Sequence, residues 1–178
     1  MAPTLEHYLK KEEAQPLTVD RLKTYVRRPG LRFVNYESIK PTTSLSKLLG
    51  PRGGVCILWS SPGGAIGHFT GLFRKGKQLL YFDPTGLAVH RLSEITHNPF
   101  VLQKKLEEAH HVTYNKTRYQ QIRKNIQSCG RHVICRWNML ELSDAQYRGV
   151  MTHRRLDADA IVTMMTVPSD LAHWSQVK

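Results

Sequence analysis

The sequence has few cysteines and no long apolar run. Its three cysteines, Cys56, Cys129 and Cys135, are an odd number at spacings that match no secreted disulfide framework. No stretch approaches the roughly 18 apolar residues of a transmembrane helix, and the Lys- and Glu-rich N-terminus carries no apolar signal segment. We therefore expect an intracellular, reducing environment and no membrane contact.

Acidic residues are also scarce: 14 Asp and Glu stand against 26 Lys and Arg, which gives a net charge of +12. The basic residues form small clusters along the whole chain and not a single tail, for example Lys10-Lys11, Arg74-Lys75, Lys104-Lys105 and Arg154-Arg155. Such a surface attracts polyanions, so we expect salt-dependent contact with DNA or RNA phosphates. A basic surface that serves only solubility is the alternative.

The length of 178 residues suits one domain over residues 1–178, and the chain contains no repeats or low-complexity segments. Thr4 to Ala14 is polar with sparse apolar positions, and Pro16 ends any helix there. We therefore expect residues 1–16 to form a peripheral N-terminal arm.

The middle of the chain predicts a sheet. Val55 to Trp59 is a fully apolar run of strand length, as in a strand buried on both faces. Residues 68–73 and 78–83 flank a hairpin-like Arg-Lys-Gly-Lys turn, which makes a three-stranded antiparallel meander with the first run. Residues 31–39 and 112–114 are further candidate strands.

Helical patterns surround this sheet, so the sequence predicts an α+β fold. Short helices are expected after Thr18 or Asp20 and over residues 44–49, and a longer one over 98–109 with Pro99 at its first position. Residues 117–128 predict a loop. A helix opened by Asp157 or Asp159 is expected to pack Ile161, Met164 and Met165 in the core.

Cys129 stands at the predicted start of a buried helix. Downstream, apolar residues recur at helical spacing: Val133, Ile134, Trp137 and Leu140. Such a helix begins near Gly130, and the free N–H groups and dipole of its N-terminus favour a thiolate, which is the nucleophilic form of cysteine. Cys129 is therefore the candidate nucleophile. A buried, inert thiol is the alternative, and we expect it for Cys56 and Cys135, which lie in apolar runs.

A thiolate nucleophile needs a base and a group that orients the base. His68 begins one predicted strand and Asp83 ends the next. If the hairpin is centred near Lys75-Gly76, the paired positions sum to about 151, which makes His68 and Asp83 direct cross-strand partners.

The other eight histidines have no comparable partner in the sequence, and we expect most of them to be solvated: His7, His90, His97, His110, His111, His132, His153 and His173. A zinc site built from Cys129, His132 and Cys135 is not expected, because three-residue steps drift around a helix and no second ligand pair follows. The sequence requires no cofactor.

The oxyanion formed when a thiolate attacks a carbonyl needs hydrogen-bond donors, typically a backbone N–H and a side-chain amide. Gln120, Gln121 and Gln127 are the candidates. Gln127 is so close to Cys129 that its side chain is expected to point away. Gln120 is favoured and Gln121 follows closely, and an ordinary surface glutamine is the alternative for each.

The order of these pieces resembles a known family. Gly67-His68-Phe69 opens a strand, Tyr81 to Gly86 (Tyr-Phe-Asp-Pro-Thr-Gly) closes the next, a glutamine follows, and then comes Cys129-Gly130-Arg131-His132. This resembles the adenovirus-type (adenain-like) cysteine proteases, which include virion-maturation proteases of double-stranded DNA viruses and virophages. Their cellular relatives are the proteases specific for ubiquitin-like proteins. The resemblance covers residues 55–140 and, more loosely, 159–166.

The resemblance implies a small, mostly antiparallel sheet packed against the helix that carries the cysteine. It implies that His68 is the base, Asp83 its orienting acid, Gln120 or Gln121 the oxyanion donor and Cys129 the nucleophile. Two features depart from the pattern: Phe69 replaces the Trp that follows the histidine in many relatives, and the spacing from glutamine to cysteine is longer than in the adenovirus enzyme.

By this resemblance, the expected function is a cysteine endopeptidase that cleaves capsid and core precursors at Gly-Gly-X or Gly-X-Gly sites during virion maturation. DNA is a candidate activating polyanion, and the expected location is the virion and the infected host cell. Two alternatives stay open. One is a deconjugating protease for a ubiquitin-like modifier, and the other is a non-enzymatic, basic virion protein that binds nucleic acid.

Overall fold

The computed structural model of the chain describes residues 4–64, 67–123, 125–152 and 154–166. Its centre is a five-stranded mixed sheet in the order β1-β2-β3-β4-β5. The strands are β1 (Leu31–Asn35), β2 (Gly54–Ser60), β3 (Gly67–Lys75), β4 (Gln78–Phe82) and β5 (Val112–Tyr114). The antiparallel pairs β2–β3 and β3–β4 confirm the predicted meander, and β1 and β5 add parallel edges. The predicted α+β class is confirmed.

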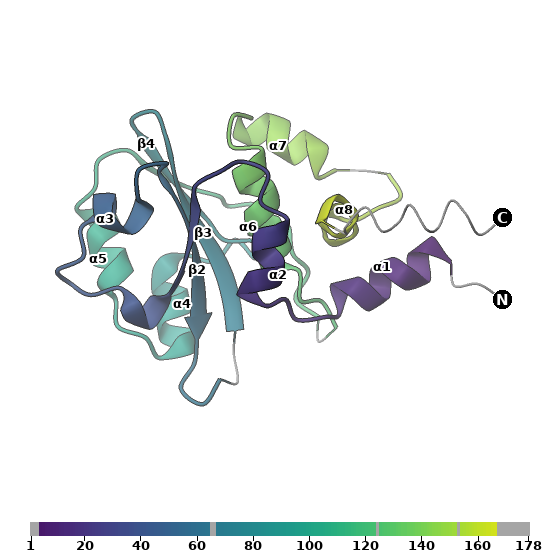
Figure 1. The fold of residues 1–178 in the computed structure, drawn as a ribbon, viewed down its shortest axis with the longest axis horizontal. Coiled ribbons are helices and arrows are strands. Elements are labelled where there is room, and N and C mark those ends of the chain that lie inside the picture. The colour runs from purple at the N-terminus through teal and green to yellow at the C-terminus, as the bar shows by residue number, and fades with distance from the viewer. Residues whose placement is uncertain (1–3, 65–66, 124, 153, 167–178) are drawn as a thin grey trace.

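Helices cover both faces of this sheet. They are α1 (Leu5–Glu13), α2 (Val19–Thr24), the 3-10 helix η1 (Tyr36–Ser38), α3 (Leu45–Leu49), α4 (Val89–Thr96), α5 (Val101–Glu107), α6 (Cys129–Asn138), α7 (Asp144–Val150) and α8 (Ala158–Thr166). Figure 1 shows α3, α4 and α5 on one side of the sheet, α6 with α2 on the other, and α1 and α8 beyond α6. Among the described residues, no helix has the length and apolarity to cross a membrane.

The central strands are apolar at successive positions because each face of the sheet has its own core. On one face, Cys56, Phe73 and Phe82 belong to the cluster that includes Val133, Ile134 and Trp137 of α6. On the other, Ile57, Leu72 and Tyr81 belong to the cluster that includes Leu92 of α4 and Leu102 and Leu106 of α5. Neighbouring residues of a strand point to opposite faces, so a doubly covered strand loses the polar alternation.

Helix α6 is enclosed on all sides, and every residue from Cys129 to Trp137 is buried. Two glycines allow the close packing. A Cβ atom on Gly54 of β2 would lie 2.3 Å from the Trp137 ring, and one on Gly130 would lie 2.6 Å from Leu22 of α2. The glycine that follows Cys129 therefore has a packing role, because α2 crosses the first turn of α6 at that point.

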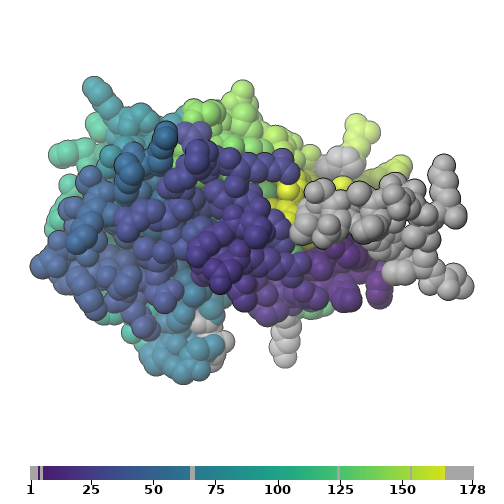
Figure 2. Space-filling view, in the orientation of Figure 1, coloured from purple at the N-terminus to yellow at the C-terminus, as the bar shows by residue number. Residues whose placement is uncertain are grey.

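The N-terminal segment is more than a peripheral arm. Helix α1 packs along α8, and its Leu9 and Glu12 are buried. The Glu12 carboxylate accepts hydrogen bonds from Arg21 (2.8 Å) and from the fully buried Arg131 of α6 (3.1 Å). In Figure 2 the purple N-terminal segment crosses the centre of the visible face and continues beside the yellow α8. The polar sequence of this segment led to the expectation of a loose arm. The buried partner of Glu12, Arg131, lies over a hundred residues away and could not be recognised from the local sequence.

Two helices were not expected from the sequence, and a third begins later than expected. Helix α4 lies just before the predicted 98–109 helix, and α7 follows α6. The predicted helix begins only at Val101 with Phe100 as its N-cap, so Pro99 precedes the helix and does not occupy its first position. The carbonyl oxygen of Pro99 instead accepts a hydrogen bond from the Tyr36 hydroxyl.

The predicted start of α8 is confirmed, but the prediction for its methionines is wrong. Met164 and Met165 are 41% and 38% exposed. The buried positions of α8 include Asp159, Val162 and Thr163. The buried face of this helix therefore carries polar groups, which a search for an apolar stripe does not detect.

Candidate active site

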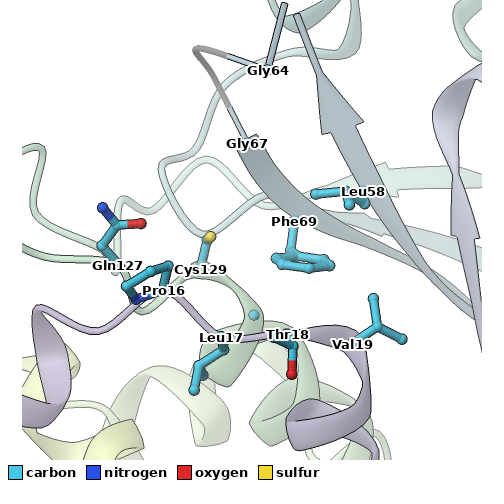
Figure 3. Close-up of a pocket in the computed structure, with 11 residues that line it drawn as sticks. Pro16, Leu17, Thr18, Val19, Leu58, Gly64, Gly67, Phe69, Gln127 and Cys129 are labelled. Carbon is cyan, nitrogen blue, oxygen red and sulfur yellow. The ribbon is translucent and has the colours of Figure 1, made fainter.

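Cys129 is the first residue of α6 and is almost completely buried. Its sulfur lies in a cleft of about 410 Å³. One wall is the 16–19 segment that joins α1 to α2, and the other is formed by Leu58 of β2 with Gly67 and Phe69 of β3. Figure 3 shows the sulfur projecting from the start of α6 between these two walls. The predicted nucleophile is thus at a helix N-terminus and faces a cavity.

His68 and Asp83 meet at the end of the sheet nearest Cys129. Their side chains are joined by contacts of 3.2 Å from His68 Nε2 to both carboxylate oxygens of Asp83. The predicted direct pairing is wrong by two residues, because the true β3–β4 register pairs Gly71 with Phe82. A two-residue shift keeps both side chains on the same face, so they meet as diagonal neighbours just beyond the last paired residues.

The Asp83 carboxylate is fully buried and rigidly held. Its Oδ1 accepts hydrogen bonds from the backbone N–H and the hydroxyl of Thr85, both at 2.6 Å. The Asn115 amide brackets the Asp83 backbone, accepting from its N–H at 2.7 Å and donating to its carbonyl oxygen at 2.6 Å. The turn after β4 and the segment after β5 therefore fix the carboxylate behind the imidazole. Sequence reasoning did not identify Asn115, which carries no distinctive local motif.

The electrostatics of His68 favour a charged imidazole. Burial lowers the pKa of His68, but hydrogen bonds to Asp83 and Cys129 and the negative charges of both groups outweigh this effect and raise the pKa to about 10. Because Nε2 contacts Asp83, Nδ1 is the ring nitrogen that remains for the sulfur. At neutral pH the imidazole is therefore charged, with the Asp83 carboxylate against one of its nitrogens.

The candidate glutamines occupy different environments. Gln120 is buried, its backbone N–H donates to Pro84 O at 2.9 Å, and its side-chain nitrogen lies 3.4 Å from Ile126 O. Its Oε1 has no partner among the described residues. The amide of Gln121, in contrast, donates to the Asp157 carboxylate at 2.6 Å. Gln127 is exposed and lines the cleft. The Gln121 amide is therefore engaged by Asp157, and the role of Gln120 stays a prediction, because its NH₂ group faces Ile126 O and it is not among the described residues that line the cleft.

A second histidine–carboxylate pair lies behind the site. His132, which was expected to be solvated, is fully buried on α6, and its Nε2 lies 2.9 Å from Oδ1 of the fully buried Asp159. The same oxygen accepts a hydrogen bond from the Ser128 hydroxyl. The sequence did hold one indication of this pair: His132 is a polar residue in a helix predicted to be buried, and a buried polar residue requires a hydrogen-bond partner.

The other two cysteines lack this chemistry. Burial raises the pKa of the Cys56 thiol well above its ordinary value, with a further contribution from the charge of Cys129. Burial likewise raises the pKa of Cys135 to about 12, against smaller opposing effects of Arg131 and Arg27. Both thiols therefore stay protonated and inert near neutral pH. Among the described residues, no three His, Cys, Asp or Glu side chains are grouped as ligands for a metal ion.

The chain matches no protein-family model and no curated protein sequence. Among solved structures it is similar to the ASFV pS273R protease, with 15% sequence identity and a TM-score of 0.48, over 93% of this chain and 69% of that chain. At this distance the likeness carries no information about chemistry, so an activity has to be argued from the side chains of the site.

Proposed function

We propose that the chain is a cysteine endopeptidase. The observation that carries this proposal is the convergence of three side chains from separate parts of the chain. Cys129 lies at the start of α6 in a cleft, His68 is near enough to it for the two side chains to interact electrostatically, and Asp83 contacts the far side of the imidazole. Nucleophile, base and orienting acid are the parts that acyl transfer requires.

The reaction begins with attack of the Cys129 thiolate on the carbonyl carbon of a peptide bond in the cleft. A carbon–sulfur bond forms and the carbonyl π electrons move to oxygen, giving a tetrahedral oxyanion. The backbone N–H groups in the first turn of α6 are suited to stabilise this charge, because no side chain caps them. The Gln120 amide is the proposed second donor.

His68 then acts as a general acid. Its imidazolium gives a proton to the leaving nitrogen as the carbon–nitrogen bond breaks, which releases an amine and leaves an acyl-enzyme. In the second half, neutral His68 takes a proton from water as the water attacks the thioester. The carbon–sulfur bond breaks, and the acid product leaves with the thiolate–imidazolium pair restored. Asp83 keeps the imidazole oriented in both halves.

The substrates that we propose are viral capsid and core precursors with Gly-Gly-X or Gly-X-Gly sites, cleaved in the virion or the infected host cell. The family resemblance of the His-Asp-Gln-Cys order supports this choice. Apart from Cys129, none of the described residues that line the cleft has a charged side chain, which suits an uncharged, slender segment such as Gly-Gly. The net charge of +12 would suit DNA as a bound activator that concentrates the enzyme on its substrates.

The test uses purified full-length protein with fluorogenic Gly-Gly-X peptides and with folded precursor proteins. We expect wild-type protein to cleave and Cys129→Ala to reduce cleavage to background without changing the unfolding temperature. Cys135→Ala, on the same helix, is the matched control and should retain activity. Cleavage by Cys129→Ala at the wild-type rate would contradict the proposal.

A thiol-reactive peptide vinyl sulfone separates the alternatives. A thiolate in the cleft predicts modification of Cys129, with Cys56 and Cys135 unmodified in the same folded molecule. Equal reactivity of the three cysteines would support a non-enzymatic nucleic-acid-binding protein on a protease-like fold. Cleavage of folded ubiquitin-like conjugates, with no cleavage of capsid precursors, would support a deconjugating protease.

A further inference from the structure

The Asp159 carboxylate gathers three hydrogen-bond donors beneath the candidate active site. Its Oδ1 accepts from the Ser128 hydroxyl and lies 2.9 Å from His132 Nε2, and its Oδ2 accepts from the backbone N–H of Gln121 at 2.9 Å. Asp159, Ser128 and His132 are all fully buried. One carboxylate therefore links α8, the first two turns of α6 and the loop that carries the oxyanion glutamine.

The protonation of this cluster follows from its partners. His132 Nδ1 is buried and has no partner among the described residues. A neutral ring with its proton on Nε2 donates to Asp159 and leaves only an acceptor unpaired, whereas a charged ring would bury an unpaired N–H. Asp159 also lies in the first turn of α8, where the helix dipole favours a negative charge. Three donors and a helix start suit an ionised carboxylate.

The first consequence concerns the start of α6. Ser128 is its N-cap, a position where a serine hydroxyl ordinarily accepts a hydrogen bond from a first-turn N–H. Here the hydroxyl donates to Asp159, and among the described residues no side chain caps the helix. The N–H groups around Cys129 are therefore available to an oxyanion.

The second consequence concerns Gln120. Its own N–H is bound to Pro84 O, in the turn that follows Asp83, and the next N–H along the chain, that of Gln121, is bound to Asp159. Two successive backbone N–H groups are thus hydrogen-bonded to two different segments, the turn after β4 and α8. Because residues 117–123 contain no helix or strand, these anchors fix the backbone from which the Gln120 side chain projects.

We propose that Asp159 is a positioning residue for hydrolysis, which acts through Gln120 by holding the backbone of the 120–121 segment against the start of α6. This inference rests on the proposed peptidase function. It assigns to α8 a part in transition-state stabilisation although Asp159 does not touch the substrate.

Asp159→Asn is the sharpest variant, because an amide has nearly the same shape but only one acceptor oxygen. If that oxygen stays with Ser128 and His132, the NH₂ group faces the N–H of Gln121, and two donors meet. The 120–121 backbone must then move. Asp157→Asn is the matched control, because Asp157 carries the same charge just before α8 and contacts the side chain of Gln121 and the backbone N–H of Ala160, but not the backbone N–H of Gln121.

The expected results follow from oxyanion-donor energetics. Gln120→Ala should lower kcat about 10²–10³-fold, the usual effect of losing such a donor. Asp159→Asn should lower kcat about 30-fold or more with KM changed less than about threefold, and Asp157→Asn should stay within about threefold of wild type. If Asp159 acts through Gln120, the double variant Gln120→Ala/Asp159→Asn should be no slower than Gln120→Ala alone by more than about threefold.

Alkylation by iodoacetamide provides a readout that does not depend on peptide cleavage. Loss of a negative charge near the start of α6 favours the thiolate, so Asp159→Asn should alkylate Cys129 at least as fast as wild type while it hydrolyses peptides more slowly. A parallel fall in both rates would mean that the variant displaces Cys129 itself and would overturn the proposal. Losses that multiply in the double variant would also overturn it.

Amide hydrogen exchange of wild-type protein keeps the proposal testable if Asp159→Asn does not fold. The Gln121 amide should exchange about 100-fold more slowly than that of exposed Ile122 next to it, because its partner is a buried carboxylate. Equal exchange of the two amides would refute the anchor. A wild-type protein that cleaves no peptide would contradict the proposed function, whereas an active enzyme with multiplicative losses would contradict only the role of Asp159.

Discussion

Two histidine–carboxylate pairs lie on either side of the first turn of α6, and they differ in what else they touch. The His68–Asp83 pair has an imidazole that is 12% exposed and reaches Cys129 in the cleft. The His132–Asp159 pair is 0% exposed and has a serine hydroxyl and a backbone N–H as its further partners. The same two residue types thus make a candidate reactive centre in one place and a buried polar cluster in the other.

The difference teaches that the third group and solvent access decide the role of such a pair. In the first pair the second imidazole nitrogen is left for a nucleophile that faces a cavity. In the second pair the other nitrogen of His132 is buried and has no partner in the described part of the chain, so the ring has no route to a substrate. Replacing the histidine of the first pair should therefore act chiefly on catalysis, and replacing the histidine of the second pair chiefly on stability.

The largest expected effect is on hydrolysis, when the His68–Asp83 pair beside the cleft, called the outer pair here, is changed. His68→Ala removes both the proton donor for the leaving amine and the base for deacylation, so kcat/KM should fall about 10³–10⁴-fold. The variant should still fold, because Asp83 keeps its hydrogen bonds from Thr85, although loss of the charged partner of a buried carboxylate lowers its stability. Hydrolysis of a Gly-Gly peptide and thermal unfolding measure the two properties. A variant that retains a tenth of the wild-type activity would remove His68 from the mechanism.

Replacing the histidine of the fully buried His132–Asp159 pair, called the inner pair here, should mainly lower stability. His132→Ala deprives the buried Asp159 carboxylate of one donor and leaves a cavity, and breaking such pairs costs about 3 kcal/mol. Urea unfolding should show this loss, and for a chain of this length the unfolding temperature should fall by roughly 6–12 °C. Activity per folded molecule should fall less than about tenfold. An unchanged midpoint would mean that the buried pair contributes no net stability.

The outer pair could be predicted from the sequence because both of its residues belong to one hairpin. A hairpin brings the start of one strand to the end of the next, and side chains alternate with a period of two. The hairpin centre was misplaced, but a two-residue error preserves the face, so His68 and Asp83 still meet. The position of Cys129 also followed from local periodicity, and α6 begins at that residue.

The inner pair could not be predicted in this way, because Asp159 lies 27 residues after His132 and nothing local links the two. The same holds for α1, whose Glu12 meets Arg131 at a separation of 119 residues. Polar residues were expected at the surface as solvated groups. In this molecule several polar side chains on α6 are buried because two peripheral helices supply their partners.

The pH dependence of hydrolysis should sharpen the comparison. A raised histidine pKa means that the imidazolium persists through neutral pH and is lost as pH rises through about 10. The kcat/KM profile should therefore have an alkaline limb near pH 10. Asp83→Asn removes the strongest of the effects that raise this pKa, so the limb should move down by at least one unit. A limb that does not move would mean that Asp83 does not stabilise the charged ring.

The smallest effect concerns Glu13, at the end of α1, whose pKa is raised from 4.5 to about 7 by burial and then by the charges of Asp157 and Asp159. A raised carboxyl pKa favours the folded state below pH 4.5, and this contribution is lost as pH rises through 7. Glu13→Gln never acquires the charge. It should therefore be more stable than wild type at pH 8 by on the order of 1 kcal/mol, and equal to it near pH 4.5.

This variant also reports on the charge of the inner pair. If Asp159 is ionised, its removal relieves part of the repulsion on Glu13, so the stabilisation by Glu13→Gln at pH 8 should shrink in an Asp159→Asn background. Denaturant unfolding of the four proteins at pH 8 and pH 4.5 measures that coupling, and it should vanish at the lower pH. An undiminished gain would mean that burial and the Asp157 charge suffice to act on Glu13 and that the Asp159 charge is neutralised within its own cluster.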